Sequence, residues 1–102
     1  MKHFVLIYDL AGDYLTRRGE FREAHLGIAW KAHEKGDLVL GGAFTDPADT
    51  AMLLFKAESK DTVEQFAKGD PYVINGLVKN WRVREWNTVA GALAVNPVKP
   101  NA

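Results

Sequence analysis

The sequence contains no cysteine, which excludes disulfide bonds, thiolate nucleophiles and cysteine-based zinc or iron–sulfur centres. It has no excess of either charge, because 13 Lys and Arg balance 13 Asp and Glu. Electrostatic attraction to nucleic acid or to anionic membranes is therefore not expected. A long hydrophobic run is also missing, since the apolar segment at residues 4–8 is too short for a signal peptide or a transmembrane helix. These absences favour a cytoplasmic protein whose partners are small molecules or other proteins, with no nucleic acid and no membrane.

The remaining composition is that of an ordinary globular domain: 102 residues, 47% of them hydrophobic and 25% charged. A chain of this length can bury a core but has no room for a separate cofactor domain, and no cofactor is expected. We expect one domain over residues 1–89. Residues 90–102, with Pro97 and Pro100, are expected to form a C-terminal tail or arm that reaches another subunit.

Two changes of hydrophobic period predict the first elements. Residues 3–8 are mostly β-branched or aromatic, which favours a buried strand. From about residue 13 to 35 the spacing becomes helical, although Gly19 weakens the first turns and also allows a start near Glu20. The expected inward stripe of this helix consists of Phe21, His25, Ile28 and Ala32.

The second half of the chain predicts a hairpin, a helix and a last strand. Segments 38–44 and 51–57 are strand-like and a turn at 46–49 joins them. A helix follows Ser59 and ends at Gly69, and 77–89 reads as a long strand. The order β-α-β-β-α-β predicts an α+β, ferredoxin-like antiparallel sheet with both helices on one face.

Both faces of this sheet are expected to be apolar. Alternate residues of the first strand are apolar on either side, Leu6 on one and Val5 on the other, and 52–55 repeats the pattern. Two helices cover only one face, so a second copy packed sheet to sheet is the simplest cover for the other, and we expect a homodimer. Trp30 lies opposite Phe21 on the helical wheel and marks another contact surface.

Arg18, Arg22 and His25 stand at i, i+4 and i+7 of the first helix and project from one narrow sector. Two guanidinium groups beside an imidazole suit a carboxylate, phenolate or enolate ligand. A core histidine hydrogen-bonded to a carbonyl, next to two solvated arginines, is the alternative.

Asp70 precedes Pro71, which pushes its backbone into the extended region and makes it an N-cap for a helix that starts at the proline. This capping role is by itself a sufficient explanation for an aspartate at position 70. The same carboxylate can also hold His25 in one tautomer, as general acid/base catalysis requires.

Further candidates for the same pocket are Tyr8, Asp9 and Tyr72, which lie at element ends. Gly42, next to Gly41, either lets a ligand approach the strand closely or marks a β-bulge. No metal is expected, because the other two histidines lack an acidic or histidine partner at ligand spacing.

These residues resemble the YCII-related family. The similarity spans about residues 3–89 and rests on Arg18 and Arg22 with His25-Leu26, on the stretch from Gly36 to Gly41-Gly42, and on Asp70-Pro71-Tyr72-Val73 followed by Gly76-Leu77. The resemblance implies a ferredoxin-like fold, a dimeric α+β barrel in which two sheets pack face to face, and an active site with a His–Asp pair. That pair falls on His25 and Asp70, with Arg22 in the same pocket. It also implies kinship with an enzyme that removes chloride from a chlorinated hydroxyhydroquinone and with muconolactone isomerases.

The resulting hypothesis is a cofactor-independent enzyme with lyase- or isomerase-like proton transfer on a small anionic or phenolic ring compound. His25 and Asp70 are the expected catalytic pair, and Arg22, Arg18, Gly42 and Tyr72 are expected to bind substrate. The alternative is a non-catalytic ligand-binding or assembly module on the same homodimeric scaffold. An oxygen-using monooxygenase is a third interpretation that no residue selects.

Overall fold

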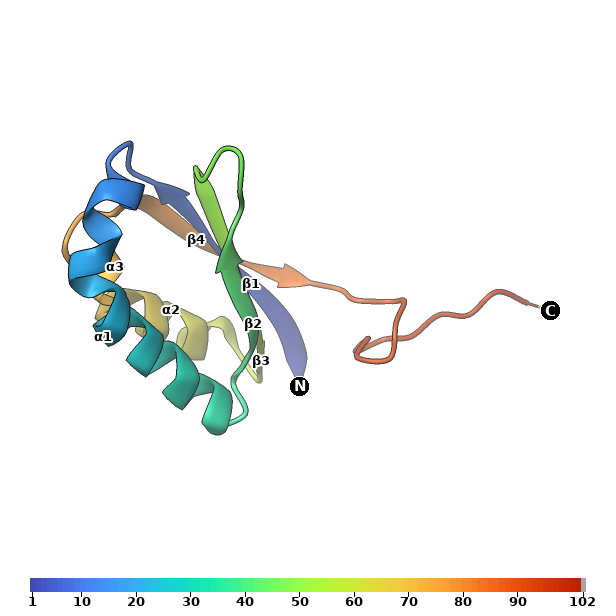
Figure 1. The fold of residues 1–102 in the computed structure, drawn as a ribbon. Helices are drawn as coiled ribbons and strands as arrows, with labels where there is room; N and C mark the ends of the chain where they lie inside the picture. Colours follow the sequence, from blue (N-terminus) through green and yellow to red (C-terminus); the bar gives the residue numbers. More distant parts are fainter. Residues whose placement is uncertain (102) are drawn as a thin grey trace.

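The computed structural model describes residues 1–101, and its elements follow the predicted order, including the short helix expected to start at Pro71. The four strands form a single antiparallel sheet in the order β2-β3-β1-β4 (Figure 1). This arrangement confirms the α+β, ferredoxin-like fold. The bounds are β1 Lys2–Leu10, α1 Tyr14–Glu34, β2 Leu38–Ala43, β3 Thr50–Ala57, α2 Lys60–Gly69, α3 Pro71–Ile74 and β4 Val78–Trp86.

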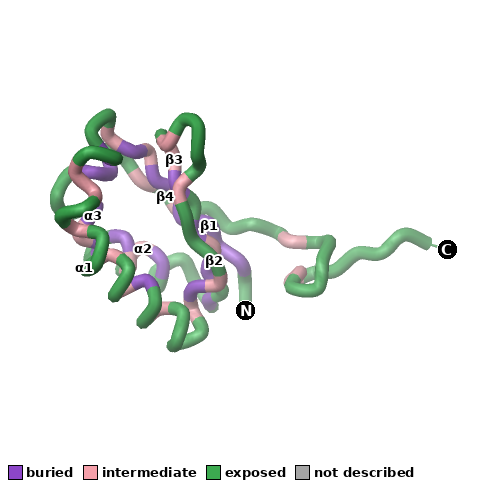
Figure 2. Tube along the Cα trace, in the orientation of Figure 1, coloured by how far each residue is buried: buried purple, intermediate pink, exposed green. Residues whose placement is uncertain are grey.

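All three helices lie on one side of the sheet, and the core fills the space between the two layers (Figures 1 and 2). The register places Leu6 opposite both Leu53 and Val83, so the central strands turn matched apolar side chains toward the helices. Leu6 is fully buried and Leu53 nearly so. The alternating side chains of β1 and β3 thus form the part of the core that lies beneath the site.

Helix α1 differs from its prediction in where it starts and in how much it buries. It begins at Tyr14, because continued hydrogen bonding through Gly19 outweighs the cost of about 1 kcal/mol for a glycine within a helix. Only Tyr14 and Ala29 of its 21 residues are buried. The expected inward stripe is therefore only half-buried, since α1 packs against α3 and β2 while a cavity separates part of it from the sheet.

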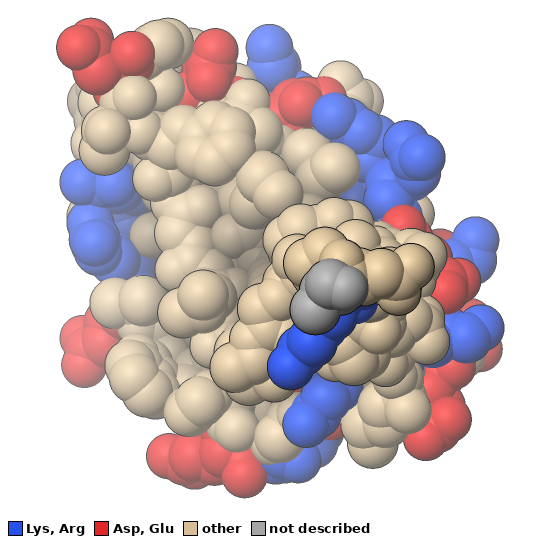
Figure 3. Space-filling view, turned by 90° about the vertical axis from the view of Figure 1, so that its right-hand side faces the viewer, with Lys and Arg blue, Asp and Glu red and all other residues tan. Residues whose placement is uncertain are grey.

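The sheet face opposite the helices is less apolar than expected. Val5 and Ile7 of β1 do lie on it, but the register places Arg84 and Arg82 of β4 beside them. The prediction considered only the two central strands and missed these charges on the edge strand. Figure 3 shows charged side chains around the rim of the side from which the tail projects and an uncharged area at its centre. Pairing of two chains through this face remains a prediction.

The last strand ends at Trp86, three residues before the predicted end. Trp86 pairs with His3 near the start of β1, so the residues beyond it have no partner backbone in that strand. The chain then leaves the body of the molecule and turns back on itself (Figure 1), with the Asn96 N–H donating to the Thr88 carbonyl. The boundary at residue 89 stays a prediction. Among residues 1–101, none of the helices offers the apolar length that a membrane crossing needs.

Candidate functional site

Asp70 is the buried centre of the candidate site. It joins α2 to α3, and its backbone is extended (φ −73°, ψ 123°), as expected for a residue before proline. Its Oδ1 accepts a hydrogen bond from the Tyr72 N–H at 3.0 Å, which confirms the predicted N-cap of α3. The side chain has no solvent exposure, so its charge and hydrogen bonds depend entirely on protein groups.

Tyr8 and His25 complete the surroundings of this carboxyl. The Tyr8 hydroxyl donates to Oδ2 at 2.7 Å, and Nδ1 of His25 lies 2.9 Å from Oδ1 and 3.0 Å from Oδ2. An ionised carboxylate only accepts hydrogen bonds, so it suits this set of donors and places a hydrogen on Nδ1. The structure thus brings together a helix residue and an acid that are 45 positions apart. Their use in catalysis stays a prediction.

The second ring nitrogen, Nε2, is the atom of His25 available to a ligand. No hydrogen bond to it is found within residues 1–101, while the ring lines the cavity and its side chain is 15% exposed. With Nδ1 protonated, the Nε2 of a neutral imidazole carries a lone pair and can accept a proton.

Tyr72 fixes the plane of the same imidazole. The two rings are stacked, with centroids 4.0 Å apart and planes inclined by 10°. Tyr14 meets Tyr72 edge to face at 5.6 Å, so the stack is itself supported. Burial raises the pKa of Tyr72, the neighbouring Tyr14 raises it further, and Arg22 and Arg18 offset part of this rise. Tyr72 therefore keeps its hydroxyl proton at neutral pH.

The Tyr8 hydroxyl is protonated for a related reason. Burial raises the pKa of Tyr8 strongly, and the charge of Asp70 and the hydrogen bond to it add to the effect. A permanently protonated phenol is a donor to Asp70 across the neutral range. Tyr8 thus gives Oδ2 of Asp70 a second partner besides His25, and no buried side-chain polar atom of the described residues lacks a hydrogen bond.

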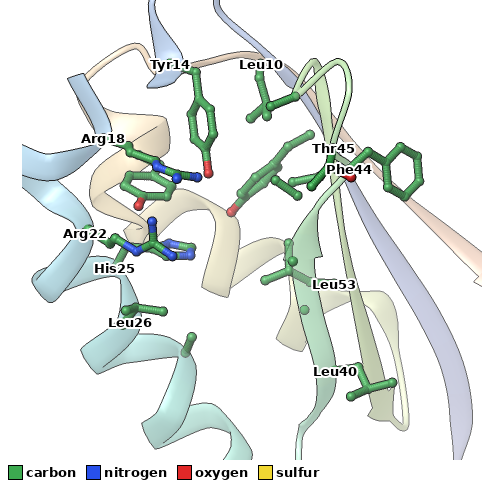
Figure 4. Close-up of a pocket in the computed structure, with 18 of the residues that line it drawn as sticks. Leu10, Tyr14, Arg18, Arg22, His25, Leu26, Leu40, Phe44, Thr45 and Leu53 are labelled. Carbon is green, nitrogen blue, oxygen red and sulfur yellow. The ribbon is translucent and has the colours of Figure 1, made fainter. Parts of the chain in front are cut away.

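A cavity of about 800 Å³ lies between α1 and the β2 edge of the sheet. Figure 4 shows Arg18, Arg22 and His25 on α1, with Leu53 across the cavity. Two of the predicted site residues do not line this space: Asp70, which lies behind His25, and Asp9. The predicted residues that line it are Tyr8, Arg18, Arg22, His25, Gly42 and Tyr72.

Asp9 is the candidate that the structure places elsewhere. Its carboxylate pairs with Arg82 of β4 at 3.2 Å, and it is absent from the cavity lining. Successive residues of a strand point to opposite faces, so Asp9 follows Tyr8 in sequence yet faces away from the pocket.

The glycine pair of β2 borders this cavity. The register shift in β2 falls between Leu38 and Leu40, so the alternative prediction of a bulge at the glycines is wrong. A Cβ on Gly41 would lie 3.1 Å from Cγ of Leu53, so any larger residue there would press against the Leu53 side chain. A Cβ on Gly42 would meet nothing within 4 Å, but Gly42 pairs with Met52 on the open face of the sheet, so only its backbone borders the cavity.

Sequence reasoning missed Tyr14 and His33 as pocket residues and did not place Trp30 in the pocket. All three line the cavity, and the contact surface expected at Trp30 stays a prediction. Nδ1 of His33 donates to the Leu38 carbonyl at 2.8 Å, and its ring meets Trp30 edge to face at 5.4 Å. Two further steps of four residues from His25, the third member of this sector, lead to Ala29 and His33, a signal that could have found this end of the pocket.

No three His, Cys, Asp or Glu side chains gather into a metal-binding group within residues 1–101. Around His25 the site offers an imidazole, a carboxylate, two guanidinium groups and three phenols. These groups can exchange protons and stabilise negative charge.

Fold and site together define a small α+β protein with a buried carboxylate–imidazole pair at the edge of a ligand-sized cavity. The family model of the YCII-related domain matches residues 1–87, and the chain belongs to this family. No curated protein matches the sequence.

Two solved structures share the fold. One is 5-chloro-2-hydroxyhydroquinone dehydrochlorinase from Burkholderia phenoliruptrix AC1100 in complex with 2,5-dihydroxybenzoquinone, with a TM-score of 0.71 and 23% identity over 84% of this chain and 94% of that one. The other is protein Atu4242 from Agrobacterium tumefaciens, with a TM-score of 0.58 and 15% identity over 93% of this chain and 98% of that one. At these identities the likeness establishes the fold alone.

Proposed function

We propose that the protein is an enzyme that transfers a proton on a small anionic or phenolic ring compound without a cofactor, in a lyase- or isomerase-like reaction. The observation that carries this proposal is the fixed position of His25. Its Nδ1 lies 2.9 Å from Asp70 and its face rests on Tyr72, so both the tautomer and the ring plane are set. A general base needs this kind of preorganisation.

In the proposed reaction Nε2 of His25 removes a proton from the substrate. The imidazolium that forms is stabilised by the carboxylate of Asp70, and the negative charge that develops on a substrate oxygen is stabilised by Arg22 and Arg18. Return of the proton to another atom completes an isomerisation. In an elimination, the electron pair of the broken C–H bond forms a double bond while an anionic leaving group departs with its own pair.

The solved relatives support the class of substrate. The dehydrochlorinase of known structure acts on a chlorinated hydroxyhydroquinone and was solved with a dihydroxybenzoquinone. Such rings carry ionisable oxygens, which two guanidinium groups and a protonated phenol can bind. The homodimer and the cytoplasmic location predicted from the sequence accompany this proposal.

The test compares the wild type with His25→Ala on a panel of hydroxyquinols and chlorinated hydroxyquinols, followed by ultraviolet absorbance and chloride release. We expect turnover by the wild type and a loss of roughly 100-fold or more in kcat for the variant. Circular dichroism and light scattering should show that the variant keeps its fold and assembly. Turnover that survives the substitution would contradict the proposal.

The alternative, a ligand-binding module, gives a different result. The wild type would bind panel members without converting any of them, and His25→Ala would weaken that binding. Oxygen uptake in the same reactions checks for a monooxygenase, and its absence across the panel would remove that interpretation.

A further inference from the structure

The cavity is much larger than a single ring needs. Its volume is about 800 Å³, whereas an engineered protein cavity of roughly 150 Å³ is enough to bind benzene. A hydroxylated single ring beside His25 would leave most of this space unfilled. The size falls instead within the range of roughly 300–1,000 Å³ that is typical of sites for larger organic ligands.

The lining of the cavity changes character along α1. The groups that suit an anionic or phenolic ring, Arg18, Arg22 and His25, lie in the first half of the helix. Beyond His25 the helix contributes Leu26, Ala29 and Trp30, and also His33, whose Nδ1 already donates to the Leu38 carbonyl. At about 1.5 Å per residue, the eight residues from His25 to His33 extend this second half by about 12 Å.

The apolar half is left without a protein partner in the described chain. The exposed fraction of Leu26 is 40% and that of Trp30 is 61%, although both line the cavity. Across from them, Gly41 of β2 has no side chain to fill the space, and a side chain there would press against Leu53. An apolar group placed here would therefore gain the free energy of burying both its own surface and that of the wall.

We infer that the ligand has two parts: an anionic or phenolic ring held by Arg18, Arg22 and His25, and an apolar extension, a second ring or an alkyl chain, that runs along α1 to Trp30. The apolar extension binds in the apolar half of the cavity. The inferred substrate class is therefore an anionic or phenolic ring that carries such an extension. Only the binding of the ring end rests on the proposed function, because proton transfer is not needed for the extension to bind.

The experiment measures by calorimetry the affinity of the full-length wild type for a series of 4-n-alkylbenzoates from methyl to hexyl. We expect the Kd to fall about fourfold with each added methylene until the apolar half is filled. A Kd that does not change with chain length in the wild type would overturn the inference, whether or not the protein proves to be an enzyme.

Variants locate the extension in the cavity. Trp30→Ala and, independently, Leu26→Ala should flatten the dependence of Kd on chain length, so a folding failure of one leaves the other as the test. The matched controls are Trp86→Ala and Leu93→Ala, which remove exposed apolar side chains outside the cavity lining and should keep the wild-type dependence. Equal flattening by the controls would place the alkyl chain elsewhere.

His25→Ala separates this inference from the proposed function. It should weaken binding of all members of the series by a similar factor and leave the fold-change per methylene as in the wild type. Loss of turnover with an unchanged dependence on chain length supports both claims. An unchanged dependence without any turnover in the wild type supports the two-part ligand and not the enzyme.

Discussion

The imidazole of His25 lies flat against the phenol of Tyr72, with ring centroids 4.0 Å apart. The backbone N–H of the same tyrosine donates to Asp70, whose carboxylate contacts Nδ1 of His25. One residue of a four-residue helix thus supports both members of the pair, the imidazole through its ring and the carboxylate through its backbone. The geometry of His25 therefore depends on how α3 is anchored as much as on α1.

Removing the ring of Tyr72 should loosen His25 without removing any hydrogen bond to Asp70. Tyr72→Leu is expected to lower the free energy of unfolding by about 2 kcal/mol, because a large buried side chain is shortened and the stack is lost. It should lower kcat more than it raises KM, since the imidazole samples unproductive orientations. Tyr72→Phe is the control: it keeps the stack and should retain most of the stability. Denaturant unfolding and steady-state kinetics check both variants, and equal kinetics for Leu and Phe would contradict the positioning argument.

Asp70→Asn should damage the chemistry more than the fold. The amide oxygen can still cap α3, but the amide N–H₂ faces Nδ1 of His25 and favours the tautomer with its hydrogen on Nε2. That tautomer cannot accept a proton from a ligand, so we expect kcat to fall by roughly 100-fold. Nitrogen-15 NMR of the imidazole should report the exchange of tautomers. The matched control is Asp9→Asn, which removes an exposed carboxylate outside the cavity and should keep full activity.

Tyr8→Phe should reveal the coupling between Tyr8 and Asp70 through the pH dependence of stability. Burial and the neighbouring carboxylate raise the pKa of Tyr8 above its usual value of 10. Above pH 10 the unfolded chain has lost this proton while the folded chain keeps it, so rising pH favours unfolding. Below pH 10 both states hold the proton and the contribution is constant.

The measurement is denaturant unfolding of the wild type and Tyr8→Phe at neutral pH and at several values above pH 10. At neutral pH the variant should be less stable by about 1–2 kcal/mol, because a hydrogen bond to a buried carboxylate is missing. The difference should shrink by about 1.4 kcal/mol per pH unit above pH 10. A difference that stays constant up to pH 11 would show that Tyr8 ionises normally in the folded protein.

The sequence could predict those features whose causes are local. Alternation in β1 and β3, helical spacing in α1 and the turn between β2 and β3 depend on residues a few positions apart, and each element was found. The cap at Asp70 follows from the proline beside it, so it was predicted correctly from two residues.

Features that depend on the distance between elements could not be derived in this way. The cavity exists because part of α1 stands away from the sheet, and no periodicity within α1 reports that separation. The contact between His25 and Asp70 could not be derived for the same reason. The spacing placed His25 in one sector with Arg18 and Arg22, but the distance from His25 to Asp70 depends on how α1 packs on α3. Arg82 and Arg84 were overlooked on the open face because an edge strand tolerates charge that a central strand would not.

The open face of the sheet is where the predicted homodimer can be tested. Met52 of β3 lies on this face opposite Ile7 and is 37% exposed, in a setting where a second sheet would cover it. We expect light scattering at low micromolar concentration to give twice the mass of the chain for the wild type. Met52→Glu should shift the protein toward the single chain, because a carboxylate buried next to Ile7 loses its hydration, and Arg82 lies on the far side of Ile7 in the same sheet. Ile74→Glu is the control, since it adds the same charge at an exposed apolar residue of α3, on the helical side of the sheet. A monodisperse monomer for the wild type would refute the dimer. If Ile74→Glu dissociates the dimer and Met52→Glu does not, the interface lies on the helical side of the sheet.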